Sequence, residues 1–148
     1  MISLAGDKVF ALSPLDLTAK LSDPAFLVQC IPDLESVAQL EAQRAVVTVR
    51  PGFAFIRGTL EVNLQVANVQ PGQVVDFIVR GKGIGSSNTV AIQLAISSQD
   101  GGSQVHWTAD VQELGGLLKA VPRGLIQATA QKVIEDVWRA AEARLNAA

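Results

Sequence analysis

The chain has 148 residues, of which 49% are hydrophobic, so it can bury a sizeable core within one domain spanning residues 1–148. Its formal net charge is -2 and its 12 Lys and Arg residues are scattered, which argues against a nucleic-acid-binding face. The single cysteine, Cys30, excludes an internal disulfide and a Cys-rich metal site. We therefore expect no bound metal and no cofactor.

No apolar run approaches the roughly 20 residues that span a bilayer. The N-terminus carries Asp7 and Lys8 too early for the apolar region of a signal peptide. These features, together with the lone cysteine, predict a soluble protein of the cytoplasm.

The N-terminal third predicts one strand followed by two short helices. Residues 2–12 alternate loosely between apolar and polar side chains, as in a strand. Two N-cap residues, each followed by proline, come next, and they predict short helices over 15–21 and from Pro24 to near Ile31. Pro32 disfavours helical geometry in the residue before it, so the second helix must end there.

From Glu41 onward the apolar residues recur at every second position, which predicts five or six antiparallel strands. Turns are expected at 51–52, 70–73 and 99–102, the last because Asp-Gly suits hairpin turns. Glycines at 81–85 lack the spacing of a phosphate-binding loop and indicate a loop or bulge. One face of the sheet should be apolar and the other polar and hydrated.

The segment 116–146 has large apolar residues at gaps of three, four and seven, which predicts a long amphipathic helix. A continuous helix would be about 45 Å long. Pro122 leaves two alternatives: a kinked helix from Gly116, or a helix that begins near Ala120. The bulk of the stripe drops at 128–130, which predicts either a close approach to the sheet or a hollow. The expected apolar stripe contains Leu117, Leu118, Val121, Leu125, Ile126, Val133, Ile134, Val137, Trp138 and Leu145.

This order of elements predicts an α+β fold. A curved antiparallel sheet wraps around a long C-terminal helix, with two short helices after the first strand. Such an arrangement often leaves an apolar space between sheet and helix.

Four short motifs follow one another along the chain: Asp23-Pro24 with Cys30-Ile31-Pro32, Ile56-Arg57-Gly58, Arg80-Gly81-Lys82-Gly83, and Gly115-Gly116-Leu117. With the opening residues, they resemble the carbon monoxide dehydrogenase G-subunit (CoxG) family, which belongs to the START-like (SRPBCC) helix-grip superfamily. Two positions depart from the family pattern. Asp33 stands in place of a glycine, and Ile56 in place of an aromatic residue.

The resemblance implies a hydrophobic cavity without an invariant catalytic set. It also implies a role beside a molybdenum-containing carbon monoxide dehydrogenase, in membrane recruitment, quinone delivery or maturation. The partners it implies are a quinone or lipid, a molybdenum hydroxylase-type dehydrogenase, and peripheral contact with the inner membrane face. Many members carry a longer C-terminal extension that contacts the membrane. This sequence ends at Ala148, so tethering through such a tail is not expected.

We therefore predict a non-enzymatic protein that binds a hydrophobic small molecule. Trp107 and Phe77 could line the cavity or fill the core, and the Thr129 hydroxyl could contact the ligand or its own helix backbone. The predicted lining residues are Leu60, Val62, Phe77, Ile92, Leu94, Trp107, Leu125, Thr129 and Val133, with Phe26 and Val28 at the entrance.

Two alternatives remain. A polyketide cyclase-like or hydrolase-like enzyme would need inward acids, bases or hydroxyl donors, and the predicted inner face offers almost none. His106, the one histidine, falls on the solvent face, and Cys30 has no basic neighbour in sequence to activate it, so no catalytic residue is assigned. The other alternative is an empty-core adaptor without a ligand, which binds a dehydrogenase or its maturation machinery through its surface.

Overall fold

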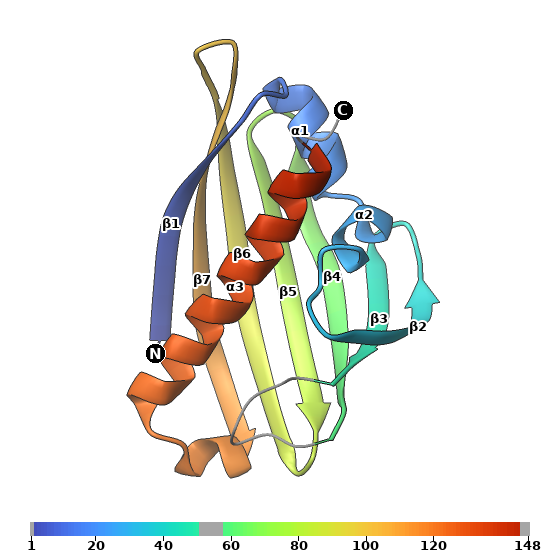
Figure 1. Cartoon of the computed structure of the whole chain (residues 1–148), viewed down its shortest axis with the longest axis vertical. Helices are drawn as coiled ribbons and strands as arrows, with labels where there is room; N and C mark the ends of the chain where they lie inside the picture. Colours follow the sequence, from blue (N-terminus) through green and yellow to red (C-terminus); the bar gives the residue numbers. More distant parts are fainter. Residues whose placement is uncertain (1, 51–57, 146–148) are drawn as a thin grey trace.

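The computed structural model describes residues 2–50 and 58–145. Within these ranges seven strands form one curved antiparallel sheet in the order β1-β7-β6-β5-β4-β3-β2, and α3 crosses its inner face (Figure 1). The strands are β1 (Ile2–Phe10), β2 (Leu34–Leu40), β3 (Arg44–Val49), β4 (Leu60–Gln70), β5 (Val74–Gly83), β6 (Ser86–Gln99) and β7 (Gly102–Gly116). The helices are α1 (Pro14–Leu21), α2 (Pro24–Val28), the 3-10 helix η1 (Leu117–Ala120) and α3 (Arg123–Leu145). The expected α+β helix-grip architecture is confirmed.

The two short helices begin where their N-cap residues predict. The Ser13 hydroxyl accepts a hydrogen bond from the Asp16 backbone N–H at 3.2 Å, and the Asp23 carboxylate accepts one from the Ala25 N–H at 3.0 Å. Helix α1 lies across β5, β6 and β7, whereas α2 lies on β2 and β3. Together they cover one end of the sheet, which we call the α1 end. The opposite end, where β7 leads into η1, is called the η1 end.

Strand β2 has no counterpart among the strands assigned from the sequence. Its apolar residues, Leu34, Val37 and Leu40, are spaced by three, not by two. Two register shifts let all three pair with inner-facing residues of β3. The bulges therefore place them on one face, although the spacing conceals the alternation typical of a strand.

Two hairpins turn at residues with left-handed backbone conformation. Asp100 and Gly101 have φ of 45° and 81°, as the Asp-Gly pair predicts. Ile84 and Gly85 have φ of 56° and 68°, so the glycine-rich segment 81–85 forms the end of β5 and a two-residue turn into β6. The turn expected at 51–52, and positions 56–57 of the second motif, lie outside the described residues.

The C-terminal helix starts later than either alternative predicted. Residues 117–120 form η1, Pro122 follows, and α3 begins at Arg123 and runs for 23 residues, about 34 Å. Because η1 and α3 do not share one helical register, the expected apolar stripe is wrong at its first turns. Leu117 is 65% exposed, and Leu125, whose side chain points about 100° away from that of buried Ile126, is 43% exposed.

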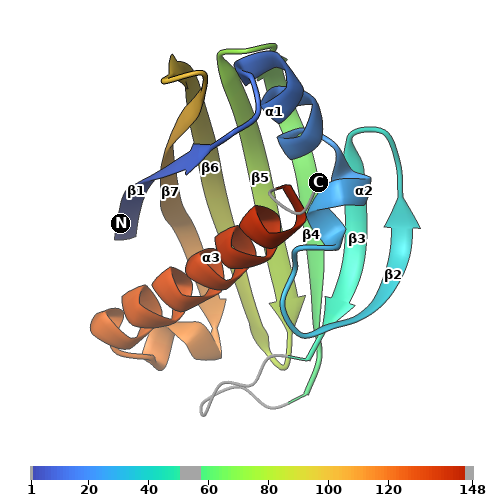
Figure 2. The ribbon, with the colours of Figure 1, turned by 45° about the horizontal axis from the view of Figure 1, so that its top comes forward.

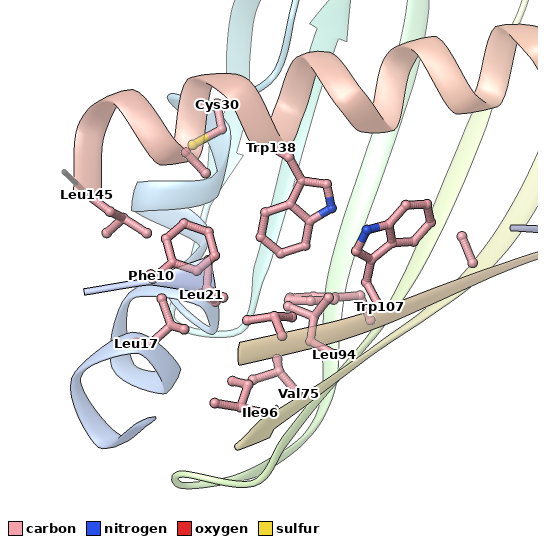
Figure 3. Close-up of a cluster of buried hydrophobic side chains, with 14 of the residues drawn as sticks. Phe10, Leu17, Leu21, Cys30, Val75, Leu94, Ile96, Trp107, Trp138 and Leu145 are labelled. Atoms are coloured by element: carbon pink, nitrogen blue, oxygen red, sulfur yellow. The ribbon is translucent and has the colours of Figure 1, made fainter. Parts of the chain in front are cut away.

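The main core lies at the α1 end (Figure 3). There Trp138 of α3 packs on the sheet, and its ring centroid lies 5.9 Å from that of Phe10. The buried members of this cluster are Leu4, Phe10, Leu17, Leu21, Cys30, Val66, Val75, Phe77, Leu94, Ile96, Val105, Trp107, Ala109, Trp138, Ala141 and Leu145.

Candidate functional site

The inner face of the sheet remains partly exposed at the η1 end. Strand register places a continuous row of apolar side chains there, and each of them is only half-buried. We call this set the β4–β6 band: Leu60, Val62, Leu64, Val79, Val90 and Ile92. On the same three strands, the residues toward the α1 end that belong to the main core are buried, and Leu64, Val90 and Ile92 of the band pack against that core. Toward the η1 end of these three strands, the inner-facing apolar surface that remains partly exposed is therefore the band.

Helix α3 runs diagonally across the inner face (Figure 2), and its closest backbone contacts with the sheet are with β1. Lys8 contacts α3 here, because the pairing of β1 with β7 turns its side chain inward, beside buried Val105. The Lys8 ammonium lies 3.2 Å from the Glu135 carboxylate and 3.6 Å from that of Glu142, both on α3. At its other end, α3 lies beside α2, where Arg144 donates a hydrogen bond to Gln29.

The predicted lining residues fall into three groups. Phe77, Leu94 and Trp107 are buried in the main core, and Val28 is buried against β3. Leu125 is exposed. The half-buried group contains Leu60, Val62, Ile92, Thr129, Val133 and Phe26. The structure thus brings three of the predicted residues together in the band, and ligand contact by any of them stays a prediction.

Thr129 is half-buried on α3. Its hydroxyl makes no hydrogen bond to any residue in the described part of the chain, its own helix backbone included. The hydroxyl is therefore available to bond to a ligand, and its role as a polar contact for that ligand stays a prediction.

Asn88 was not identified from the sequence. It lies on β6 two residues before Val90, so it shares the inner face with the band, and it pairs with Gly81 of β5. The residue is half-buried, and its amide has no hydrogen-bond partner within residues 2–50 and 58–145. The parity of Asn88 with Val90, Ile92 and Leu94 was visible in the sequence and could have identified it.

The Trp107 indole N–H is a second polar group that is buried without a hydrogen-bond partner among the residues described. The ring lies against Gly6, where an added Cβ would come within 2.8 Å of Nε1. Figure 3 shows that the nitrogen edges of Trp107 and Trp138 face one another across the core. A donor left unsatisfied in an apolar interior destabilises the fold unless a small polar molecule accepts from it.

Cys30 is a packed core residue. Its side chain is buried, and the thiol lies 3.6 Å from the carbonyl oxygen of Phe26. Burial raises the pKa of the Cys30 thiol, and the nearby Arg144 guanidinium opposes that rise. Arg144 is a basic neighbour that is distant in sequence, but the net effect disfavours the nucleophilic thiolate.

His106 lies on the outer face, as predicted. Its Nδ1 is 2.9 Å from an Asp7 carboxylate oxygen, and both side chains are exposed. Among the described residues, no group of three or more His, Cys, Asp or Glu side chains could hold a metal ion.

A surface groove of about 380 Å³ lies where β7, η1 and the start of α3 meet. Its apolar floor is buried cluster residues and its rim carries charges. The lining residues are Ile2, Val111, Gln112, Glu113, Leu114, Leu118, Lys119, Val121, Arg123 and Ile126. None of the predicted lining residues belongs to it. Leu114 pairs with Asn88, so the groove lies next to the inner face at the η1 end.

A family model for the G subunit of carbon monoxide dehydrogenase (CoxG) matches residues 11–146. The chain belongs to the CoxG family. No curated relative matches the chain in sequence. A conserved protein from Geobacillus kaustophilus has the same fold, with a TM-score of 0.86 and 18% identity over 98% of this chain and 95% of that one.

A START superfamily protein from Mycobacterium smegmatis is also similar in structure. Its TM-score is 0.71 and its identity is 14%, over 97% of each chain. These likenesses establish the START-like fold of this CoxG-family chain. In residues 2–50 and 58–145, no helix combines the length and apolar character needed to cross a bilayer.

Proposed function

We propose that this CoxG-family protein binds a hydrophobic small molecule, a quinone or a lipid, between α3 and the β4–β6 band. In this proposal it serves a molybdenum-containing carbon monoxide dehydrogenase-type enzyme, in membrane recruitment, quinone delivery or maturation. Family membership and the START-like fold support a hydrophobic-ligand accessory protein.

One observation carries the proposal: the band is apolar, faces inward and is only half-buried. An apolar ligand that covered it would gain about 25 cal/mol for each Å² of apolar surface removed from water, before the costs of binding. The sheet edge beside β1 is closed by α3 and its ion pairs. We therefore place the ligand on the other side of α3, over β4, β5 and β6.

A binding function without catalysis fits the polar groups near this space. On the inner face, Asn88 carries a neutral amide, and Lys8 is engaged by two carboxylates. Thr129 of α3 adds a hydroxyl. This set does not resemble the paired acid and base, or the activated nucleophile, that cyclase or hydrolase chemistry uses.

The test replaces a band residue by a larger one. Ile92→Trp should fill the space, whereas Gln93→Trp, its neighbour on the outer face, adds the same ring to solvent. Gently purified protein would be weighed by native mass spectrometry, and released molecules would be extracted and identified. We expect a quinone or lipid with the wild type and with Gln93→Trp, and none with Ile92→Trp. Equal ligand content in both variants would refute the location.

A second candidate, the ligand-free adaptor, is favoured by the edge strand β2. Its residues Leu34, Val37 and Leu40 form an exposed apolar row at the end of the inner face. If the wild type carries and takes up no quinone or lipid but still binds the dehydrogenase, the adaptor function is supported instead. Loss of dehydrogenase binding in Ile92→Trp alone would instead tie partner binding to the ligand.

A further inference from the structure

We infer that Asn88 is the side chain that recognises the polar end of the ligand. We further infer that this end is an uncharged carbonyl or hydroxyl group and not a carboxylate. The inference rests on the proposed function and deepens it, because it names the chemical class of ligand that the band would accept.

Asn88 lies at the edge of the β4–β6 band. Register pairs it with Gly81 on β5, and Gly81 in turn pairs with Val62 on β4. Val90, the next inner-facing residue along β6, belongs to the band. A ligand whose apolar part lies on the band could therefore reach the amide with one end.

Gly81 makes room for the amide on this face. A Cβ at position 81 would lie 3.1 Å from Nδ2 and 3.2 Å from Oδ1 of Asn88. The side chain of Asn88 thus extends over the glycine, where a larger residue would displace it. The backbone of Gly81 does not have the positive φ that itself favours glycine, so close approach is the reason for its presence.

The amide has unused hydrogen-bonding capacity. It offers two donors and an acceptor, and within the described ranges it bonds to nothing. The residue is half-buried, and a ligand group that bonded to its amide in an apolar site would be favoured. An amide can donate to a carbonyl oxygen, and it can also exchange hydrogen bonds with a hydroxyl.

The charges that the described strands place on the inner face disfavour an anionic end group. Along the strands described, Lys8 is the one cation that register places on the inner face, and Glu135 and Glu142 already surround its ammonium. The basic residues of α3 are exposed. A carboxylate held beside Asn88 would lose hydration without gaining a counter-ion from the inner face of the described strands, which is unfavourable.

Dodecanol and dodecanoate are suitable probes, because they share the same apolar chain and differ in charge at one end. Binding to the full chain can be followed by the fluorescence of its two tryptophans, with native mass spectrometry to count bound molecules. We expect the wild type to bind dodecanol more tightly than dodecanoate. Asn88→Leu, which keeps a similar side-chain volume, should weaken dodecanol binding about three- to tenfold, the value of one hydrogen bond.

Two further variants sharpen the test. Thr89→Val alters the neighbouring side chain on the outer face and should leave binding unchanged. Gly81→Ala keeps the amide but displaces it, so it should weaken dodecanol binding in the same direction as Asn88→Leu. Gly81→Ala also serves if Asn88→Leu fails to fold.

The outcomes separate the two proposals. If the wild type binds neither probe and carries no ligand, the proposed function fails, and the role of Asn88 fails with it. If it binds dodecanol and both Asn88→Leu and Gly81→Ala bind equally well, ligand binding stands and the role of Asn88 is refuted. Tighter binding of dodecanoate would refute the uncharged end group alone.

Discussion

The α1 end and the η1 end of the inner face carry the same kinds of aliphatic side chain but differ in what covers them. At the α1 end, Val75 and Leu94 are covered by α1 and by Trp138 of α3. At the η1 end, Val79 and Val90 lie on the same two strands and are only half-buried. Hydrophobicity of the strands therefore does not decide which end is a closed core. The cover does.

Among the described residues, the elements that cover the two ends of the inner face differ in how many aromatic side chains they contribute. All five aromatic residues within the described ranges pack in or against the main core, and they are Phe10, Phe26, Phe77, Trp107 and Trp138. Toward the η1 end, α3 instead carries Ala128, Thr129 and Ala130. Rings supply the bulk that fills the space between a helix and a sheet, and small residues do not. Within the described residues, the same sheet and helix thus form a closed core at the α1 end and leave a partly exposed apolar surface at the η1 end.

The largest expected difference between the two ends is in stability. Trp107→Ala would open a cavity in the closed core and should reduce the free energy of unfolding by about 3–5 kcal/mol. Val90→Ala removes two half-buried methyl groups from the band and should cost about 1 kcal/mol. Urea denaturation followed by circular dichroism measures both. Similar losses would mean that the two ends are equally closed.

A second pair of variants tests how tightly the core is packed at Gly6. An added Cβ there would meet the Trp107 ring at 2.8–2.9 Å, so Gly6→Ala should cost about 1–3 kcal/mol. Gly124, in the first turn of α3, has nothing within 4 Å of its would-be Cβ, and Gly124→Ala should stabilise the protein by up to about 1 kcal/mol. Thermal unfolding distinguishes the two. A neutral Gly6→Ala would show that the indole can move, and the core would be looser than its burial indicates.

Strand parity and turn chemistry made most of the fold predictable. The alternation in β4, β5, β6 and β7 assigned the inner face correctly, and the N-cap residues located α1 and α2. Strand β2 was missed because its bulges convert a spacing of three into a common face. The start of α3 could not be derived because Pro122 is compatible with more than one helix start, and the exposure of Leu125 depends on that choice.

The candidate site was less predictable than the fold. The alternation of residues along a strand identifies the face on which a side chain lies, but not which elements pack over that face. Trp107 and Ile92 have the same inward parity, yet one is buried and the other half-buried. That difference depends on where α3 crosses, and along β1 the helix is contacted by Lys8, a charged residue at an inward position. A local sequence rule would place such a lysine in solvent. Its partners, Glu135 and Glu142, are more than a hundred residues away along the chain.

The smallest expected effect concerns this attachment of α3 to β1. Lys8→Met keeps the apolar part of the side chain in place but removes both ion pairs, and it should reduce the free energy of unfolding by about 1 kcal/mol or less. The partners are about 24–39% exposed, so salt should screen them. At an ionic strength of about 1 M, where the Debye length is about 3 Å, the difference from wild type should shrink.

Lys132→Met is the matched control, because it removes an ion pair from the same helix without touching β1. The Lys132 ammonium lies 2.8 Å from the Asp136 carboxylate, and its hydrogen bond is the main cause that lowers the pKa of Asp136. Lys132 is exposed, and a surface pair of this spacing contributes little to stability. If the two variants lost the same stability with the same dependence on salt, the Lys8 pairs would be ordinary surface pairs. The position of α3 over β1 would then depend on apolar packing alone, chiefly that of Trp138 against Phe10.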